Sequence, residues 1–214
     1  MKAGWRMRYI ITGLFFLLSS FFIVGVGPTE AAAPVFEITP LVGYSLGGGF
    51  GEASTGQSLD LDEGAHYGLS LGLKFDEQSL VEVFYSHQET SFIPDANVFG
   101  INEFDLNVDY FHFAGTHIVT TEGVMPFVTF SVGATRFDPD SSEFDSEIKF
   151  SFSIGGGVRY FFSEHVGFKL EGRGYCTIMS IDNEIFCRNN QCVVVNEGEG
   201  FCQFQGTTGL IMAF

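Results

Sequence analysis

The segment Gly200–Phe214 reads GFCQFQGTTGLIMAF, and its alternate positions differ sharply in polarity. One set of alternate positions is apolar: Phe204, Leu210, Met212 and Phe214. The other set is polar or small: Gln203, Gln205, Thr207 and Gly209. A period of two residues is that of a β-strand with two unlike faces. The segment therefore predicts a strand with one apolar face, and the rest of the chain repeats this pattern.

The composition predicts a protein made of strands and turns. The chain has 214 residues, of which 27 are Gly and 26 are Phe, and only 17% are charged. This size suits one domain or at most two, and the residue usage favours strands over amphipathic helices. Acidic residues outnumber basic ones 26 to 10, for a formal charge of −16. Such a surface argues against nucleic acid as a partner, because phosphate binding needs clustered Lys and Arg.

Residues 1–31 have the layout of a cleavable signal peptide. Basic residues precede an apolar run, Tyr9–Val26, and Gly27–Glu30 then leads to three alanines, Ala31–Ala33. Export and cleavage after Ala31 are predicted, which leaves residues 32–214 as one domain and removes Trp5, the only tryptophan. The alternative is a retained membrane anchor, since the run is just long enough to span a bilayer. Polar and small residues within the run and the small-residue site after it favour the signal peptide.

Eight segments of two-residue period follow the signal, each long enough for a tilted membrane strand. They are Phe36–Leu46, Ala65–Phe75, Leu80–Thr90, Phe104–Ile118, Pro126–Phe137, Glu147–Phe162, Val166–Ser180 and Gly200–Phe214. No apolar stretch of helical spanning length remains after the signal. A chain of this kind enters a membrane only as a closed barrel, because every backbone polar group must be paired there.

The connections between these segments alternate in length. Three are short: Asp76–Ser79, Val119–Met125 and Ser163–His165. Four are long: Gly47–Gly64, Ser91–Glu103, Asp138–Ser146 and Ile181–Glu199. In membrane barrels the short turns face the periplasm and the long loops face outside. The sequence therefore predicts an all-β fold, an eight-stranded antiparallel up-and-down transmembrane β-barrel with both ends of the domain on the periplasmic side.

Charged residues concentrate on one face of the predicted strands. In Val166–Ser180, Lys169, Glu171 and Arg173 alternate with Phe168 and Leu170. The predicted barrel-interior charges are Glu37, Lys74, Glu82, Asp105, Asp109, Lys149, Arg159, Lys169, Glu171 and Arg173. An eight-stranded barrel is only just wide enough to be filled by side chains, and unpaired charge inside it is costly. We therefore expect a paired ion network that forms a plug rather than a pore.

Periodicity alone leaves open a water-soluble, lipocalin-like barrel with its apolar faces inward. Three features favour apolar faces that point into lipid: the export signal, the sorting of loop lengths to one end, and aromatic residues near the predicted periplasmic rim. Those aromatic residues are Phe36, Phe75, Tyr160, Phe162, Phe168 and Phe214.

All four cysteines lie in the last predicted hairpin. Cys187 and Cys192 flank a short stretch of the long loop, while Cys176 and Cys202 lie on the strands on either side. In an oxidising envelope this arrangement predicts a Cys187–Cys192 disulfide, with Cys176–Cys202 as a possible second one. Free thiols, or a pair that faces lipid unbridged, are the alternatives. Four scattered thiols lack the paired short spacings of a zinc site, so no metal and no cofactor is predicted.

With these features the chain resembles the small outer-membrane β-barrel proteins of Gram-negative bacteria, of the porin-like, eight-stranded opacity and attachment type. The resemblance covers nearly the whole chain after the signal. Besides the strands it rests on Gly155–Phe161, which leads into Val166–Tyr175, and on the last segment, Gly209–Phe214. It implies a place in the outer membrane, reached by export through the periplasm, among membrane lipid and lipopolysaccharide.

The resemblance also implies an assembly signal at the end of the chain. In that family a final Phe preceded by alternating apolar residues is read by the barrel-assembly machinery, and Leu210, Met212 and Phe214 match this pattern. A monomer is favoured, although the resemblance leaves the oligomeric state open. One fold of this kind hosts adhesins, narrow channels and enzymes, so it does not fix the activity.

The histidines form no catalytic pattern. Ser86 and His87 are adjacent, so on a strand they point to opposite faces and cannot act as nucleophile and base. Outer-membrane lipid A deacylases carry His and Ser with one residue between them, on one face of a strand. None of the five histidines here has a serine two residues after it. We therefore expect no enzyme.

The long connections are acidic, with Asp60, Asp62, Asp138, Asp140 and Glu184 among their carboxylates. Divalent-cation bridging to lipopolysaccharide or adhesion to a cationic partner are functional interpretations. A solvated exterior that resists aggregation is the simpler one. We expect a structural or surface-interaction protein that presents acidic extracellular loops. The alternatives are a narrow porin-like channel for small hydrophobic molecules or ions and, less favoured, a lipid-modifying enzyme.

Overall fold

The computed structural model describes residues 35–51, 58–93, 104–119, 123–139, 146–178, 184–188, 191–194 and 200–214. These residues belong to one compact unit, Ala33–Phe214. Across the described ranges we find no helix with the length and apolar character needed to cross a membrane. The predicted signal peptide, residues 1–31, lies outside the described residues.

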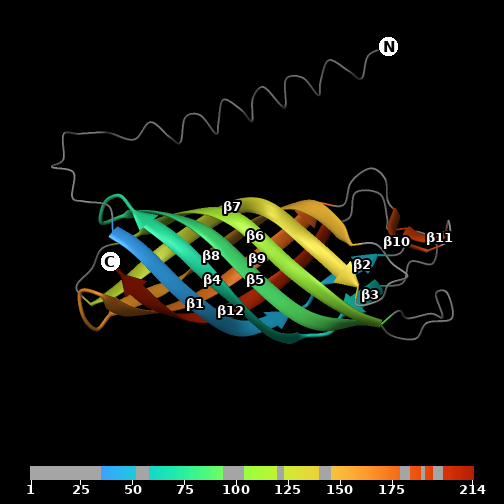
Figure 1. Cartoon of the computed structure of the whole chain (residues 1–214), viewed down its shortest axis with the longest axis horizontal. Coiled ribbons are helices and arrows are strands. Elements are labelled where there is room, and N and C mark those ends of the chain that lie inside the picture. Colours follow the sequence, from blue (N-terminus) through green and yellow to red (C-terminus); the bar gives the residue numbers. More distant parts are fainter. Residues whose placement is uncertain are drawn as a thin grey trace, which may run out of the picture. The chain divides into compact units, whose positions relative to one another are not determined.

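Eight long strands close into one antiparallel sheet (Figure 1). They are β1 (Val35–Leu46), β4 (Gly64–Lys74), β5 (Ser79–Ile93), β6 (Phe104–Ile118), β7 (Val124–Pro139), β8 (Glu147–Phe161), β9 (Val166–Ile178) and β12 (Gly200–Ala213). Each pairs with the next in this order, and β12 pairs with β1, which closes the barrel. The predicted fold class is confirmed, and every predicted strand end lies within three residues of the observed one.

Four short strands in the long connections were not predicted. They are β2 (Gly49–Gly51), β3 (Ser58–Leu61), β10 (Glu184–Arg188) and β11 (Gln191–Val194). β2 pairs with β3, and β3 extends the sheet beside the last residues of β5. β10 and β11 form a separate hairpin. Such short pairs are missed by periodicity, since three to five residues carry too few alternations to register.

The two ends of the barrel differ. The connections β4–β5, β6–β7 and β8–β9 are short and lie at one end together with the C-terminus, which we call the short-turn end (Figure 1). The other end, where the long connections lie, is the long-loop end. In the β4–β5 turn, the Asp76 carboxylate accepts hydrogen bonds from the backbone N–H groups of Gln78 and Ser79, at 2.8 and 2.7 Å. These bonds lower the pKa of Asp76.

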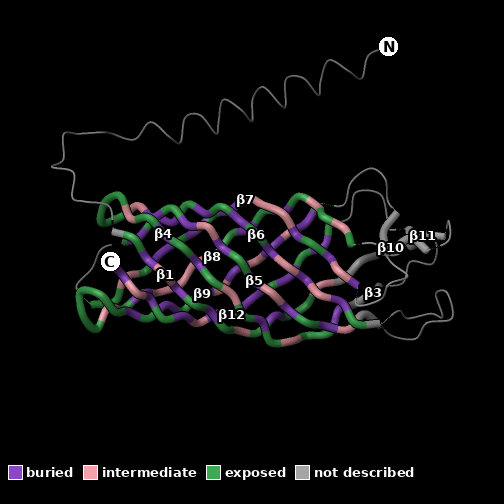
Figure 2. The backbone as a smooth tube through the Cα atoms, in the orientation of Figure 1, coloured by how far each residue is buried: buried purple, intermediate pink, exposed green. Residues whose placement is uncertain are grey.

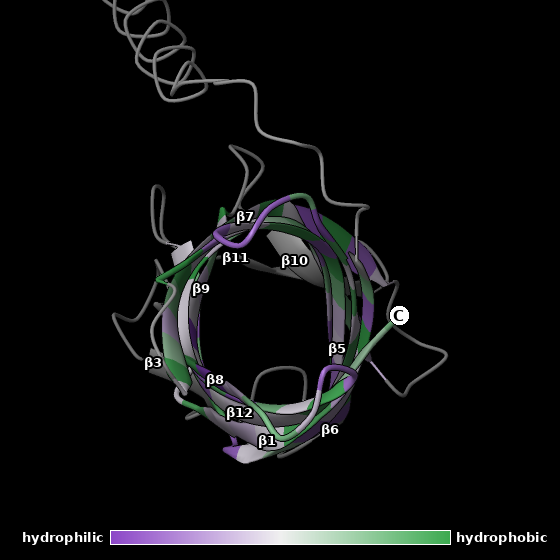
Figure 3. Cartoon of the chain, turned by 90° about the vertical axis from the view of Figure 1, so that its left-hand side faces the viewer, coloured by the Kyte–Doolittle hydropathy of each residue, from purple (hydrophilic) through white to green (hydrophobic). Residues whose placement is uncertain are grey.

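The strands are tilted, as closure requires. Following register partners once around the barrel from Phe36 on β1 leads back to β1 at Leu46, ten residues nearer the long-loop end. This offset is the shear of the barrel, which fixes the strand tilt for a given number of strands. Seen along its axis, the sheet forms a closed ring (Figure 3).

Burial alternates along every long strand (Figure 2). On β12 the pattern places Gln203, Gln205 and Thr207 on the inner wall and Phe204 and Leu210 on the outer wall. The apolar faces therefore point outward, which excludes the lipocalin-like alternative over most of the barrel. The aromatic residues predicted at the rim are exposed on the outer wall near the short-turn end: Phe36, Phe75, Tyr160, Phe162, Phe168 and Phe214.

Candidate functional site

The half of the lumen nearer the short-turn end holds a network of ion pairs. Arg159 on β8 pairs with Glu37 on β1. On β9, the Lys169 Nζ lies 3.2 Å from Oε1 of Glu82, which is on β5, and 2.9 Å from Oε2 of Glu171. Arg173 binds Glu171 Oε1 at 2.6 Å. All six side chains are buried, and three carboxylates face three cations, so the network carries no net charge.

Neutral groups also contact this network. Glu82 also accepts hydrogen bonds from the hydroxyls of Ser70 and Thr116, at 2.8 and 2.7 Å. The Arg173 guanidinium lies 4.4 Å from the centre of the Phe84 ring, within the range of a cation–π contact. Partners of this kind are what permit charge in a low-dielectric interior. The network ties strands together across the lumen and fills it.

Two further predicted charges lie on the inner wall away from the network. Lys149 pairs with Glu147 at 2.6 Å on β8, towards the long-loop end. Lys74 is half-buried where β4 reaches the short-turn end. Glu147 was not predicted as an interior charge, although it lies two residues from Lys149 and therefore on the same face of the strand.

The middle of the lumen is lined by two histidines with hydroxyl partners. The Nδ1 and Nε2 of His112 lie 2.7 and 2.9 Å from the hydroxyls of Ser131 and Ser151. His66 lies 3.0 Å from both Ser45 and Thr207. Neither cluster was predicted, because the hydroxyl partners of each histidine come from different strands. Both rings are buried. Because each ring bonds to hydroxyls of two other strands, the two clusters link nearby strands of the barrel.

Towards the long-loop end the lumen is packed with rings. Tyr110 stacks on Tyr175 with ring centres 4.0 Å apart, and Phe137 packs edge-on against Phe201 at 5.3 Å. Leu106 and other apolar side chains of β6 are buried beside them. The aromatic layer lies between the ion network and the long-loop end.

The prediction for Asp105 and Asp109 as interior charges was wrong. Both carboxylates lie on the outer wall of β6, while Val108 and Tyr110 are fully buried in the lumen. The half of β6 nearer the short-turn end decides this, since Phe111 faces outward there and the strand continues to Asp105 without a bulge. Side chains therefore keep alternating between the two walls even where the apolar residues change from the outer wall to the inner one. At the long-loop end the outer wall of β6 is polar and its inner wall is apolar, which is the arrangement of a water-soluble barrel.

Asp109 belongs to a polar cluster on the outer wall. It accepts a hydrogen bond from the Tyr85 hydroxyl at 2.9 Å, and its Oδ1 lies 2.7 Å from the Nδ1 of His87. A cavity of about 450 Å³ lies beside the ends of β5 and β6. Its lining is polar: Glu89, Thr90, Ser91, Asp105 and Asn107. The carboxylates that sequence reasoning placed inside the barrel are thus part of its outer, loop-end surface.

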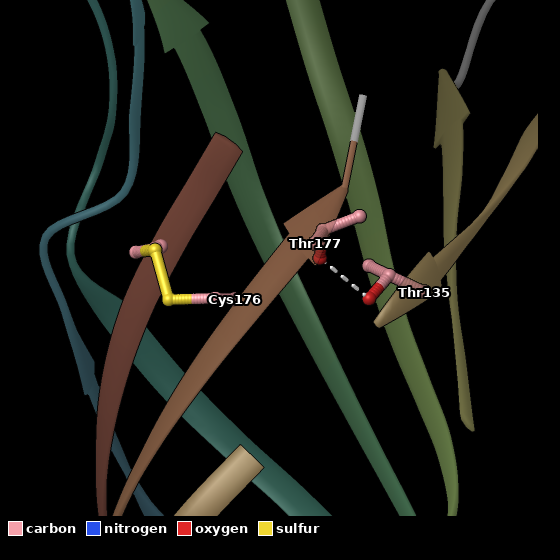
Figure 4. The surroundings of a disulfide bond; sticks show 4 residues. Thr135, Cys176 and Thr177 are labelled. Carbon is pink, nitrogen blue, oxygen red and sulfur yellow. Dashed lines mark hydrogen bonds between the residues drawn. A yellow bond between two sulfur atoms is a disulfide. The ribbon is translucent and has the colours of Figure 1, made fainter. Parts of the chain in front are cut away.

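Cys176 on β9 and Cys202 on β12 are register partners and form a disulfide, with Cα atoms 4.2 Å apart. Figure 4 shows this bond on one side of β9, while the neighbouring Thr177 reaches Thr135 at 2.8 Å on the other side. The disulfide therefore lies on the outer wall and the threonine pair in the lumen. β10 and β11 carry Cys187 and Cys192, whose side chains lie outside the described residues. Within the described ranges, no group of three metal-binding side chains is found.

A family profile described as outer membrane protein beta-barrel domain matches residues 19–191 of this chain. This is most of the sequence. Among curated proteins, no sequence matches this one.

Several solved structures share the fold. The crystal structure of Neisserial surface protein A is similar over 87% of this chain and 100% of that chain, at 13% identity and a TM-score of 0.57. The outer membrane protein OprG from Pseudomonas aeruginosa is similar over 86% and 97%, at 12% identity and a TM-score of 0.54. The outer membrane protein AlkL, solved in lipid bilayers, gives 90% and 97%, at 12% identity and a TM-score of 0.54. Identities this low speak for the fold alone.

Proposed function

The chain belongs to the outer membrane protein beta-barrel family and is a protein of the outer membrane of Gram-negative bacteria, and from this premise we propose that it acts as a closed scaffold. In this proposal the barrel has a structural or surface-interaction role and holds acidic loops at the cell surface. It does not conduct solutes.

The observation that carries the proposal is the filled lumen. The pairs Glu37–Arg159 and Glu82–Lys169 join strands that face each other across the barrel. The aromatic pair Tyr110–Tyr175 lies between this network and the long-loop end. A conducting path for ions or small hydrophobic molecules requires these groups to separate, which exposes charges that are now paired and buried.

Planar bilayers containing the purified, oxidised protein test the proposal. We expect no conductance steps with the unaltered chain. A Glu82→Ala, Lys169→Ala variant removes a neutral pair and enlarges the lumen, so conductance steps in that variant show that the assay detects an opened barrel. Steps of similar size in the unaltered protein would favour the narrow channel over the scaffold.

A non-enzymatic role is part of the proposal. Both ring nitrogens of His112 bond to serine hydroxyls, so neither is left for the carboxylate that orients a catalytic base. The His87–Asp109 pair is on the outer wall, with a tyrosine rather than a serine beside it. We expect identical lipid A mass spectra from cells with and without the protein. A mass shift that depends on the protein would contradict this part.

We further propose that Leu210, Met212 and Phe214 serve as the assembly signal. All three lie on the outer wall of β12 or directly after it, and Phe214 is 70% exposed. A partner that reads the strand before the barrel closes meets these side chains first. Phe214→Ala is expected to reduce the folded protein recovered from outer membranes, while the same variant refolds normally from urea into detergent. Equal losses in both settings would indicate a stability defect instead.

A further inference from the structure

The outer wall near the long-loop end has two unlike sides. On β5, β6 and β7 it carries His87, Asp109 and Arg136, each in register with the next. On β8 and β9 it carries Ile148 and Ile178, which are exposed. The change falls between β7 and β8, where Arg136 pairs in register with Ile148.

The polar side is held by interactions within its own wall. Asp109 is bonded to both Tyr85 and His87, and Arg136 lies 2.7 Å from Asp138. The Glu89 side chain, beyond His87 on β5, is 80% exposed. Charged groups on the outer wall of a membrane barrel are tolerated at the headgroup level and disfavoured among acyl chains. This side therefore marks where the hydrocarbon layer ends on β5–β7.

The apolar side continues the lipid-facing band without a break. Ile148 is 68% exposed and Phe150 is 55% exposed on β8, directly beyond Phe152 and Ile154 of the band. Ile178 is 50% exposed at the corresponding end of β9. No charged side chain of the outer wall interrupts β8 between Ile154 and Ile148 in this described strand.

Height along the barrel makes the contrast sharper. A register row climbs towards the long-loop end as it passes from β5 through β6 and β7 to β8, because one full turn ends ten residues further along β1. Ile148 is therefore further from the short-turn end than Arg136, its register partner. An apolar side chain lies above a charged one, which a membrane boundary perpendicular to the barrel axis does not accommodate.

We propose that the outer boundary of the hydrocarbon layer runs obliquely around this barrel. Acyl chains cover Ile148, Phe150 and Ile178 on β8–β9, and lipid headgroups meet the cluster of His87, Asp109 and Arg136 on β5–β7. The occupant of the apolar side is lipid because the patch is continuous with the band that lipid already covers. The proposal goes beyond the scaffold function, since a silent barrel and a conducting one can both sit obliquely.

Tryptophan fluorescence tests this proposal with little background. Trp5 is the only tryptophan in the chain, so a Trp5→Phe background is free of tryptophan. In that background, Ile148→Trp and Arg136→Trp report the two sides, and Leu170→Trp reports the middle of the band. Each variant is refolded into phosphatidylcholine vesicles in which part of the lipid carries bromine on its acyl chains, and folding is checked by heat-modifiable migration on gels.

We expect bromine to quench Ile148→Trp nearly as well as Leu170→Trp, and Arg136→Trp several-fold less. Iodide in the water should quench them in the reverse order. Equal quenching of Ile148→Trp and Arg136→Trp by brominated lipid overturns the oblique boundary. Protection of Ile148→Trp from both quenchers, with dimers on chemical cross-linking, overturns it in favour of a second copy on this face. If Ile148→Trp does not fold, Phe150→Trp replaces it, with the same expectations.

Discussion

The charged side chains in the lumen work as a set because each has partners from other strands. Lys169 lies between Glu82 and Glu171, and Glu171 in turn holds Arg173. These four side chains and the Glu37–Arg159 pair together carry no net charge. In a buried network, removal of one member costs more than the pair contributes, because the remaining charge has neither partner nor water. The importance of a residue here follows from its neighbours across the lumen.

Lys169→Met is therefore expected to destabilise the barrel strongly. The substitution leaves Glu82 and Glu171 without their shared cation, at an expected cost of about 3–5 kcal/mol. Urea unfolding in detergent micelles, followed by circular dichroism, measures the loss. Lys74→Met is the matched control, since Lys74 is half-buried at the short-turn end and does not belong to the six-residue ion network described above. This variant should change stability by less than about 0.5 kcal/mol. Similar losses in both variants would contradict the network as a unit.

At the scale of elements, β9 and β12 are held together both by a backbone ladder and by a disulfide. Their ladder runs from Gly200↔Ile178 to Met212↔Val166, and the Cys176–Cys202 bond lies near its open end. This bond closes a loop of 26 residues that contains β10 and β11. A cross-link restricts the unfolded chain, so it stabilises the hairpin in addition to the backbone ladder.

The Cys176→Ser, Cys202→Ser double variant is expected to lose about 3.5 kcal/mol, the loop-closure contribution for a link of this length. Urea unfolding of the variant and of the oxidised parent under identical conditions gives the difference. Replacing both cysteines avoids mispairing with the remaining two. A parent that is no more stable than the variant would show that the ladder alone holds this hairpin.

As a whole molecule, the barrel combines two opposite arrangements of apolar and polar faces in one sheet. Over most of its length the outer face is apolar and the inner face polar, whereas on β6 near the long-loop end this order is reversed. The same pleat serves both arrangements, because alternation only separates two faces. Which face is apolar depends on what that part of the wall contacts. Over most of the barrel the outer wall contacts lipid, and near the long-loop end the inner wall contacts the packed rings of the lumen.

Ile154→Arg tests the lipid-facing wall of the whole barrel. Ile154 is 69% exposed on the outer face of β8. In lipid vesicles the substitution should cost about 2–4 kcal/mol, the penalty for a cation near the middle of the bilayer. Ile154→Leu is the matched control and should be close to neutral. The readout is the urea midpoint in vesicles. In water an exposed arginine carries no such penalty, so equal stability of the two variants would place this face outside the hydrocarbon layer.

The sequence by itself determined the eight strands, their boundaries and the alternating loop lengths. These depend on local features, the two-residue period and the turn residues, that hold whatever the rest of the chain does. It also identified Lys169, Glu171 and Arg173 as facing away from the apolar side of one strand. The same alternation placed the last apolar residues, Leu210 among them, together on one face of the last strand.

Only the tertiary structure decided which charges meet and where polarity inverts. Glu37 and Arg159 are far apart in the sequence, and the shear of the closed sheet brings them together. Asp105 and Asp109 alternate with apolar residues just as interior charges do, so their local pattern could not show that they lie on the outer wall. In the closed sheet, the unbroken pleat of β6 puts them on the same face as Phe111, which points outward. Alternation is a property of one strand, whereas the wall that it faces depends on closure and on the surrounding solvent.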